Sequence, residues 1–422
     1  APQFINQTTG NGSTWQVADI FSGGDSYPGR EMAILVGDTM YFDADDYNYG
    51  IELWAHDTSN ASTWRVTDIN SGSGDGSPGH DGLAILVGDT LYFNANDGSS
   101  GFELWAHDTS NASTWRVADI NSGSGDSDPG DYMSMLVGDT LYFSADDGSS
   151  GRELWAHDTS NASTWRVADI NSGTDDSISS FRMTILVGDT LYFSANDGSS
   201  GYELWAHDTS NASTWRVADI NSGTGHSLPG RYMSILVGDT LYFDAEDGGS
   251  SGIELWAHDT SNASTWLVTD IRSGTSNSFP GYQMSMLVGD TLYFDATDGS
   301  SRELWAHDTS NSSTWRVTDI RSTGNSNLGK YMDTLVGDTL YFSADDGSSG
   351  HELWAHDTSN ASTWRVADIY SGTSNSYPGQ FMEILVGDTL YFSANDGSSG
   401  RELWAHDTSN ASTWRVADIY SG

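Results

Sequence analysis

The sequence has 422 residues, and its 59 Asp and Glu against 16 Lys and Arg give a formal net charge of −43 at pH 7. This charge makes DNA, RNA and anionic membrane surfaces implausible partners, so we expect no nucleic-acid partner and no membrane insertion. The chain has no cysteine, which excludes disulfides, thiolate metal sites and cysteine nucleophiles.

The first residues, Ala1-Pro2-Gln3, have no initiator Met and no apolar leader, which is typical of a mature end after signal removal. Apolar runs of membrane-spanning length are absent from the sequence, and Asn-x-Ser/Thr sequons recur along it. We therefore expect an extracellular or cell-surface protein.

A Thr-Trp pair recurs every 49 to 51 residues, at Trp15, Trp64, Trp115, Trp165, Trp215, Trp266, Trp315, Trp364 and Trp414. That period is the size of a four-stranded propeller blade. We divide the chain into an N-terminal extension, residues 1–12, and one repeat domain, residues 13–422.

One repeat, taken from Met133, predicts four strands in order: 133–137, 140–145, 153–157 and 163–170. Gly138-Asp139 makes a tight turn after the first, an Asp-Gly-Ser-Ser-Gly loop follows the second, and 159–162 turns into the fourth. Alternation along the second strand predicts that both blade faces are buried, and Trp165, Val167 and Asp169 are expected to share one side of the fourth strand. The fold class is thus all-β, an eight-bladed β-propeller of four-stranded blades of about 50 residues; the alternative is an open β-repeat solenoid or superhelix.

The motif Glu-Leu-Trp-Ala-His-Asp-Thr, with Leu-Tyr-Phe-Ser-Ala-Asp-Asp-Gly-Ser-Ser-Gly before it and Val-Ala-Asp-Ile after it, resembles the ELWxxDGT tandem-repeat family of bacterial secreted and surface proteins. The resemblance covers residues 13–422. It departs at the turn, where the family's Asp-Gly-Thr is replaced by Asp158-Thr-Ser-Asn161. The resemblance implies a surface repeat protein and supplies no catalytic residues.

Eight sequons fall in one turn, between the third and fourth strands, and two more lie near the start. Repeated placement in an exposed turn predicts N-linked glycans; the alternative is a polar turn in which Asn tolerates left-handed geometry. The predicted sites are Asn6, Asn11, Asn60, Asn111, Asn161, Asn211, Asn262, Asn311, Asn360 and Asn410.

The loop after each second strand brings an Asp, several glycines and a following Glu together, at a spacing that resembles a calcium loop. The alternative is an Asp-Gly hairpin loop whose Asp caps its own turn. Calcium is thus a candidate cofactor, with ligand pairs Asp46/Glu52, Asp97/Glu103, Asp147/Glu153, Asp197/Glu203, Asp247/Glu254, Asp298/Glu303, Asp346/Glu352 and Asp396/Glu402.

A histidine precedes an Asp in every third strand, as at His157. We interpret it as a structural hydrogen-bond group that contacts Thr164, Trp165 and Asp169, because a catalytic group would occur at one site and not in every repeat. Binding is better assigned to positions that differ between repeats. These lie between the fourth strand and the next first strand, and their aromatic residues are candidates to stack on sugars: Tyr27, Tyr132, Tyr232, Phe279, Tyr282 and Tyr377.

The fourth-strand motif occurs nine times and the other three occur eight times each, so either 13–20 or 412–419 is a surplus strand. The spare strand could pack as an edge strand, leave the ring open, remain disordered, or pair with a neighbouring molecule and propagate a filament. The assembly residues would be Trp15, Val17, Ile20, Trp414, Val416 and Ile419.

Together these features predict a non-enzymatic extracellular scaffold that is glycosylated and self-associates. The alternative is a propeller that binds carbohydrate with calcium. A glycan or a surface protein is the candidate partner beyond self-association.

Overall fold

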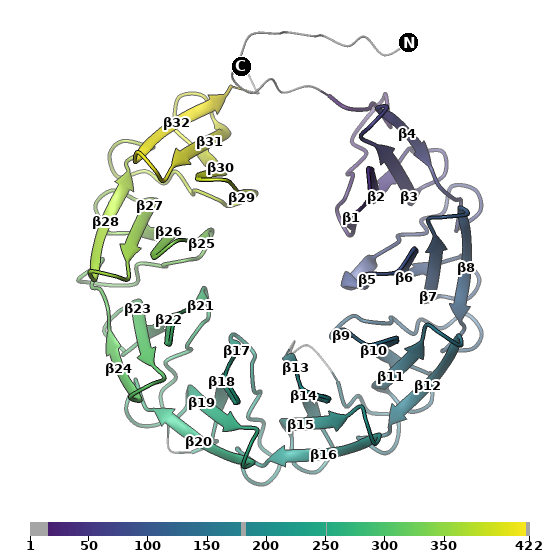
Figure 1. Ribbon diagram of the computed structural model, residues 1–422, viewed down its shortest axis with the longest axis horizontal. Coiled ribbons are helices and arrows are strands. Elements are labelled where there is room, and N and C mark those ends of the chain that lie inside the picture. Colours follow the sequence, from purple (N-terminus) through teal and green to yellow (C-terminus); the bar gives the residue numbers. More distant parts are fainter. Residues whose placement is uncertain (1–15, 179–182, 250, 419–422) are drawn as a thin grey trace. The chain divides into compact units, whose positions relative to one another are not determined.

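The computed structural model describes residues 16–178, 183–249 and 251–418. These residues form eight four-stranded antiparallel sheets, which are the blades of an eight-bladed β-propeller, and this confirms the fold class predicted from the repeats (Figure 1). The blades belong to two compact units: blades 1 to 4 lie in Trp15–His226, and blades 5 to 8 lie in Ser227–Gly422.

Each blade is a simple meander in which every strand pairs with the next one along the chain. Blades 1 to 4 contain β1 (Ala33–Val36), β2 (Thr39–Asp45), β3 (Ile51–Asp57) and β4 (Ser62–Arg65); β5 (Ala84–Val87), β6 (Thr90–Asn96), β7 (Phe102–Asp108) and β8 (Ser113–Ala118); β9 (Ser134–Val137), β10 (Thr140–Asp146), β11 (Arg152–Asp158) and β12 (Ser163–Ala168); β13 (Thr184–Val187), β14 (Thr190–Asn196), β15 (Tyr202–Asp208) and β16 (Ser213–Ala218). Blades 5 to 8 contain β17 (Ser234–Val237), β18 (Thr240–Glu246), β19 (Ile253–Asp259) and β20 (Ser264–Thr269); β21 (Ser285–Val288), β22 (Thr291–Thr297), β23 (Arg302–Asp308) and β24 (Ser313–Arg316); β25 (Asp333–Val336), β26 (Thr339–Asp345), β27 (His351–Asp357) and β28 (Ser362–Ala367); β29 (Glu383–Val386), β30 (Thr389–Asn395), β31 (Arg401–Asp407) and β32 (Ser412–Ala417).

The helix content of the described residues is one short 3₁₀ turn, His80–Gly82. In this part of the chain we find no helix with the length and apolar character needed to span a membrane.

The fourth strand departs from the sequence prediction because it contains a bulge. In blade 3, Leu154 pairs with Ala168 but Trp155 pairs with Arg166, so Val167 is an extra residue. A bulge reverses the alternation beyond it, and Ala168 therefore takes the face that Trp165 occupies. The expectation that Trp165, Val167 and Asp169 share one side was wrong for this reason.

The core lies between neighbouring blades, as the two-sided alternation of the second strand predicted. One face of blade 2 presents Tyr92, Leu104 and Ala106, and these residues pack against Leu141 and Phe143 of blade 3. The same arrangement recurs within both units. Complete burial of a Leu or Phe side chain contributes about 1.5–3 kcal/mol to the free energy of unfolding, so each blade is stabilised mainly by packing on its neighbours.

The repeated histidine is buried and forms the contact with threonine that the sequence predicted. In blade 3, His157 is 1% exposed and its Nδ1 lies 2.9 Å from Thr164 Oγ1. Its ring also lies 5.4 Å from the ring of Tyr92, in the preceding blade. Asp169 instead forms an ion pair with Arg166, at 3.6 Å.

Candidate functional site

The two ends of every blade carry different kinds of loop. At one end, Phe102 N–H donates to Asp126 Oδ1 at 2.8 Å, which joins the start of a third strand to the loop between blades. At the opposite end, Thr109 N–H donates to Asp89 O at 2.8 Å, which joins the sequon turn to the Gly-Asp turn. We call the first end of each unit its variable face; it comprises the loops between blades and the first residue of each third strand.

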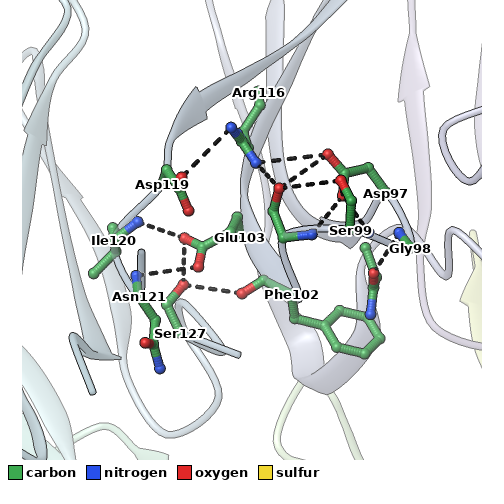
Figure 2. A network of polar contacts seen from close by, with 12 residues as sticks. Asp97, Gly98, Ser99, Phe102, Glu103, Arg116, Asp119, Ile120, Asn121 and Ser127 are labelled. Atoms are coloured by element: carbon green, nitrogen blue, oxygen red, sulfur yellow. Dashed lines mark hydrogen bonds and ion pairs between the residues drawn. The ribbon is translucent and has the colours of Figure 1, made fainter. Parts of the chain in front are cut away.

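A buried glutamate positions each loop of the variable face (Figure 2). Glu103 is the second residue of β7 and is fully buried. Its Oε2 accepts hydrogen bonds from Ile120 N–H at 2.6 Å and from Ser127 Oγ at 2.8 Å, and its Oε1 accepts one from Asn121 N–H at 3.1 Å. An equivalent bond from an isoleucine N–H recurs in the first seven blades, so one carboxyl in each holds the chain that leads to the next blade.

Burial makes six of these glutamates unusually weak acids. Desolvation raises the pKa of the side chain from 4.5 to about 7, against the opposing effect of the hydrogen bonds that the carboxylate accepts. The pKa is raised to about 7 at Glu52, Glu103, Glu153, Glu254, Glu303 and Glu352.

The aspartate predicted to share calcium with each glutamate lies in a separate network. Asp97 Oδ1 accepts hydrogen bonds from Ser99 N–H at 2.9 Å and from Ser100 N–H at 2.8 Å, and Oδ2 pairs with Arg116 at 3.5 Å (Figure 2). The turn ends at Gly101, where φ is 72° and a Cβ would collide with the backbone oxygen of Gly125. The turn therefore requires glycine there.

The glutamates of the predicted calcium pairs lie inside the blades, which differs from the expectation that they line the loop. Glu203 in blade 4 is fully buried; its Oε2 accepts a hydrogen bond from Ile220 N–H at 2.7 Å and its Oε1 accepts one from Asn221 N–H at 3.3 Å. Glu402 in blade 8 is 3% exposed. The other six are fully buried: Glu52, Glu103, Glu153, Glu254, Glu303 and Glu352. The sequence spacing missed this because a Glu in the second position of a strand points into the blade and away from the preceding turn.

Each candidate aspartate thus lies in the turn before a third strand, and each candidate glutamate is the second residue of that strand. Within residues 16–178, 183–249 and 251–418, no group of three or more His, Asp or Glu side chains is arranged to hold a metal ion. Calcium binding stays a prediction.

The eight sequon turns share one geometry at the end of the blade opposite the variable face. Asn161 is exposed; its Nδ2 donates to Asp158 Oδ2 at 2.6 Å, and its Oδ1 accepts from Ser163 Oγ at 2.6 Å. Ala162 between them has a φ of 59°. Asn6 and Asn11 lie outside the described residues, and glycosylation at all ten positions stays a prediction.

The last blade contains its own fourth strand, because β32, with Trp414 and Val416, pairs with β31. At the other end of the chain, Val17 and Ile20 lie in a segment that is not a strand, and Ile20 packs against Phe42, Ala44 and Trp54 of blade 1. Trp15 and Ile419 lie outside the described residues.

Basic residues divide between the scaffold and the variable face. Seven of the sixteen occupy one repeated fourth-strand position: Arg65, Arg116, Arg166, Arg216, Arg316, Arg365 and Arg415. The other nine occupy positions at which the residue type differs between repeats: Arg30, Arg152, Arg182, Arg231, Arg272, Arg302, Arg321, Lys330 and Arg401. Residue 182 lies outside the described residues.

The variable-face aromatics form clusters with these cations. In blades 5 and 6, the rings of Tyr232 and Tyr282 are 5.0 Å apart, and the Arg302 guanidinium lies 5.0 Å from the Tyr282 ring. In blades 7 and 8, the rings of Tyr331 and Tyr377 are also 5.0 Å apart.

The sequence reasoning missed the first residue of each third strand as part of this surface. Its signal was present, because the residue changes from blade to blade while the Glu-Leu-Trp that follows does not. The residues at this position are Ile51, Phe102, Arg152, Tyr202, Ile253, Arg302, His351 and Arg401.

Neither a family model nor a curated protein matches this sequence. Among solved structures, the fold is similar to that of dipeptidyl peptidase 4 from Porphyromonas gingivalis, with a TM-score of 0.59 and 9% identity over 95% of this chain and 61% of that chain. A puromycin hydrolase has a TM-score of 0.41 and 13% identity over 91% of this chain and 60% of that chain. A prolyl endopeptidase has a TM-score of 0.41 and 15% identity over 79% of this chain and 48% of that chain. The first likeness shows a shared fold, and this chain spans about three fifths of the length of that peptidase.

The first likeness overturns the prediction of a non-enzymatic scaffold, because a propeller of this fold forms part of a peptidase, P. gingivalis dipeptidyl peptidase 4, and the fold therefore gives no ground for setting catalysis aside. The prediction rested on the even repetition of the histidines. That argument concerns the repeated positions alone and does not apply to the variable face, where the blades differ.

Proposed function

We propose that this chain is a peptide-recognising propeller that works with a peptidase active site. Its variable face binds segments of peptide, and the bound peptide is a substrate for hydrolysis. The observation that carries the proposal is the fold likeness to the P. gingivalis dipeptidyl peptidase 4 over 95% of this chain.

The side chains of the variable face support a peptide ligand. Aromatic rings such as Tyr282, which is 49% exposed, provide apolar contact area together with a polar tip. Arginines beside these rings donate hydrogen bonds to carbonyl and carboxylate oxygens. Because each blade contributes different side chains, successive residues of a peptide would meet different chemistry.

The variable face carries cations as well as carboxylates. The net charge is −43, yet nine of the sixteen basic residues lie at positions where the residue type differs between repeats. Some of these cations are already paired with carboxylates, as Arg152 and Arg302 are, so an unpaired one would attract an acidic group, and the carboxylates attract basic segments.

The proposal is tested with the full chain and a library of random decapeptides, measured for binding and for hydrolysis. We expect enrichment of particular peptides and a fall of about tenfold in their affinity in Tyr282→Ser. Thr109→Ala, at the opposite end of a blade, is the matched control and should leave affinity unchanged. Absence of both binding and hydrolysis, or equal affinity in Tyr282→Ser, would overturn the proposal.

We also propose that the protein acts outside the cell, which the recurrent sequons support. Fractionation of the source cells tests this location, and recovery of the protein in the cytoplasm alone would exclude it. Self-association stays a prediction.

A further inference from the structure

Three arginines occupy one equivalent position, the first residue of a third strand: Arg152 in blade 3, Arg302 in blade 6 and Arg401 in blade 8. In each, Nη1 donates to the backbone oxygen of a residue in the loop that precedes the same blade. The acceptors are Asp128 at 3.0 Å, Phe279 at 3.1 Å and Tyr377 at 3.2 Å. The three guanidinium groups therefore lie at matching points of their blades.

Carboxylates neutralise two of these arginines. In blade 3, Arg152 lies 3.1 Å from Asp128 Oδ2 and 3.6 Å from Asp131 Oδ2. In blade 6, Arg302 lies 2.6 Å from Oδ2 of Asp295, a fully buried residue of β22. Pairing offsets the cost of removing both charges from water, so these two arginines are structural.

Arg401 has a neutral residue at every one of those acidic positions. Tyr377 replaces Asp128, Gln380 replaces Asp131, and Ser393 replaces Asp295. The contacts confirm that Ser393 takes the place of Asp295. In blade 8, Phe381 N–H donates to Ser393 Oγ at 3.1 Å. In blade 6, the equivalent Gln283 N–H donates to Asp295 Oδ1 at 2.7 Å. Within the part of the chain that the structure describes, Arg401 forms no ion pair.

The surroundings of Arg401 leave it able to bind an anion. Its Nη2 donates to Gln380 Oε1 at 2.6 Å, so two of its five N–H donors are used by these bonds. Its guanidinium carbon lies 4.8 Å from the ring centre of Phe381, which is exposed, and 5.9 Å from that of Tyr377. These ring contacts help to hold the guanidinium in place, and its remaining N–H donors can bind an anion.

We propose that Arg401, with Tyr377, Gln380 and Phe381, forms a subsite for a carboxylate group of the peptide ligand. The identification of the ligand as a peptide rests on the proposed function; the anion site rests on the comparison of the three arginines. A carboxylate matches the planar fork of a guanidinium and accepts two parallel hydrogen bonds from it. In a chain of net charge −43, this unneutralised cation distinguishes the subsite from its two counterparts.

The direct test uses N-acetyl-phenylalanine and its amide as probes, titrated into the full chain while the arginine Nε–H resonances are followed by NMR. Arg401→Gln identifies the resonance of Arg401 by its loss. We expect the acid to shift this resonance and to bind at least about tenfold more tightly than the amide. No shift with the acid, equal shifts with acid and amide, or a persistent preference for the acid in Arg401→Gln would each overturn the proposal.

Two substitutions restore the missing negative charge without removing the arginine. Gln380→Asp copies blade 3, and Ser393→Asp copies blade 6, so each should abolish the preference for the acid while the blade still folds. Ser343→Asp is the matched control, because it adds the same charge at the equivalent place in blade 7, where the third strand begins with His351. Retention of acid binding in both restoring variants would contradict the subsite.

Peptides then show whether the bound carboxylate is the C-terminus of the ligand or an acidic side chain. A free C-terminal acid is compared with the C-terminal amide, and an internal Asp with Asn, in peptides selected from the decapeptide library. Peptide binding that is independent of both changes and of Arg401 would refute the subsite and leave the proposed function intact. Binding of the small acid at Arg401 without binding or hydrolysis of any peptide would refute the proposed function and leave the anion site at Arg401 intact.

Discussion

Glu153→Gln should make the protein less stable in acid and more stable in base. Glu153 is fully buried, and burial raises its pKa from 4.5 to about 7. Because the folded-state pKa lies above the unfolded-state value, its contribution to stability is complete below pH 4.5 and is lost as the pH rises through about 7. Glutamine has no proton to lose, so the substitution removes this pH dependence from one blade.

The magnitude follows from the shift and from the contacts. Each pKa unit corresponds to about 1.4 kcal/mol, so ionising Glu153 in the folded protein costs about 3 kcal/mol. Glutamine keeps one acceptor oxygen but turns an NH₂ group toward a backbone N–H, which loses a hydrogen bond worth about 1 kcal/mol. The variant should therefore lose about 1 kcal/mol at pH 4.5 and gain about 2 kcal/mol at pH 8.

Thermal and urea unfolding of both proteins at pH 4.5, 6 and 8 measures this difference, with circular dichroism as the signal. Asp139→Asn, which removes an exposed carboxylate from the β9–β10 turn of the same blade, is the control and should show no comparable change of sign. An equal loss of stability at all three pH values would refute the reasoning, since it would mean that the carboxyl keeps one charge state throughout.

Four further outcomes are expected. Leu154→Ala removes a fully buried side chain between blades 3 and 4 and should cost about 2–5 kcal/mol in urea unfolding, whereas a loss below 1 kcal/mol would show that the blades are not close-packed there. Thr164→Val leaves His157 without its hydroxyl partner and should cost about 1–2 kcal/mol, more than Thr159→Val at the exposed turn; equal losses would contradict the His–Thr contact. Glycosylation at the sequons predicts that the mass of the native protein falls on enzymatic deglycosylation, and an unchanged mass would end that prediction. Calcium binding predicts a lower melting temperature in EDTA; an unchanged melting curve together with a flat calcium titration would reject it.

The strands and their loops could be predicted because the relevant signals are local. Gly138-Asp139 marks a turn, Leu141, Phe143 and Ala145 alternate with polar or aromatic neighbours, and the structure places β10 there with one residue more. The bulge at Leu154 and Trp155 could not be predicted, because no glycine or proline marks it and the pairing of both strands determines it.

The role of the repeated glutamate was missed because its partners are distant in sequence. Glu103 bonds Ile120 N–H, 17 residues away, and only the folded path of the loop brings them together. A charged residue inside an apolar strand in every repeat was the available signal. The pairing of Arg152 with Asp128, and the neutral setting of Arg401, likewise depend on contacts between a strand and a loop more than twenty residues earlier. Arg302 pairs instead with Asp295 on the neighbouring strand.

The near-identical contacts between blades affect how the chain reaches its native order. The Tyr92–His157 contact is repeated as Tyr142–His207, so the face of one blade is a suitable docking surface for several others. Side-chain complementarity cannot then specify which blade follows which, and the short connections along the chain must do so. Synthesis from the N-terminus favours the correct order, whereas refolding of the whole chain at once permits swapped blades and exchange between molecules.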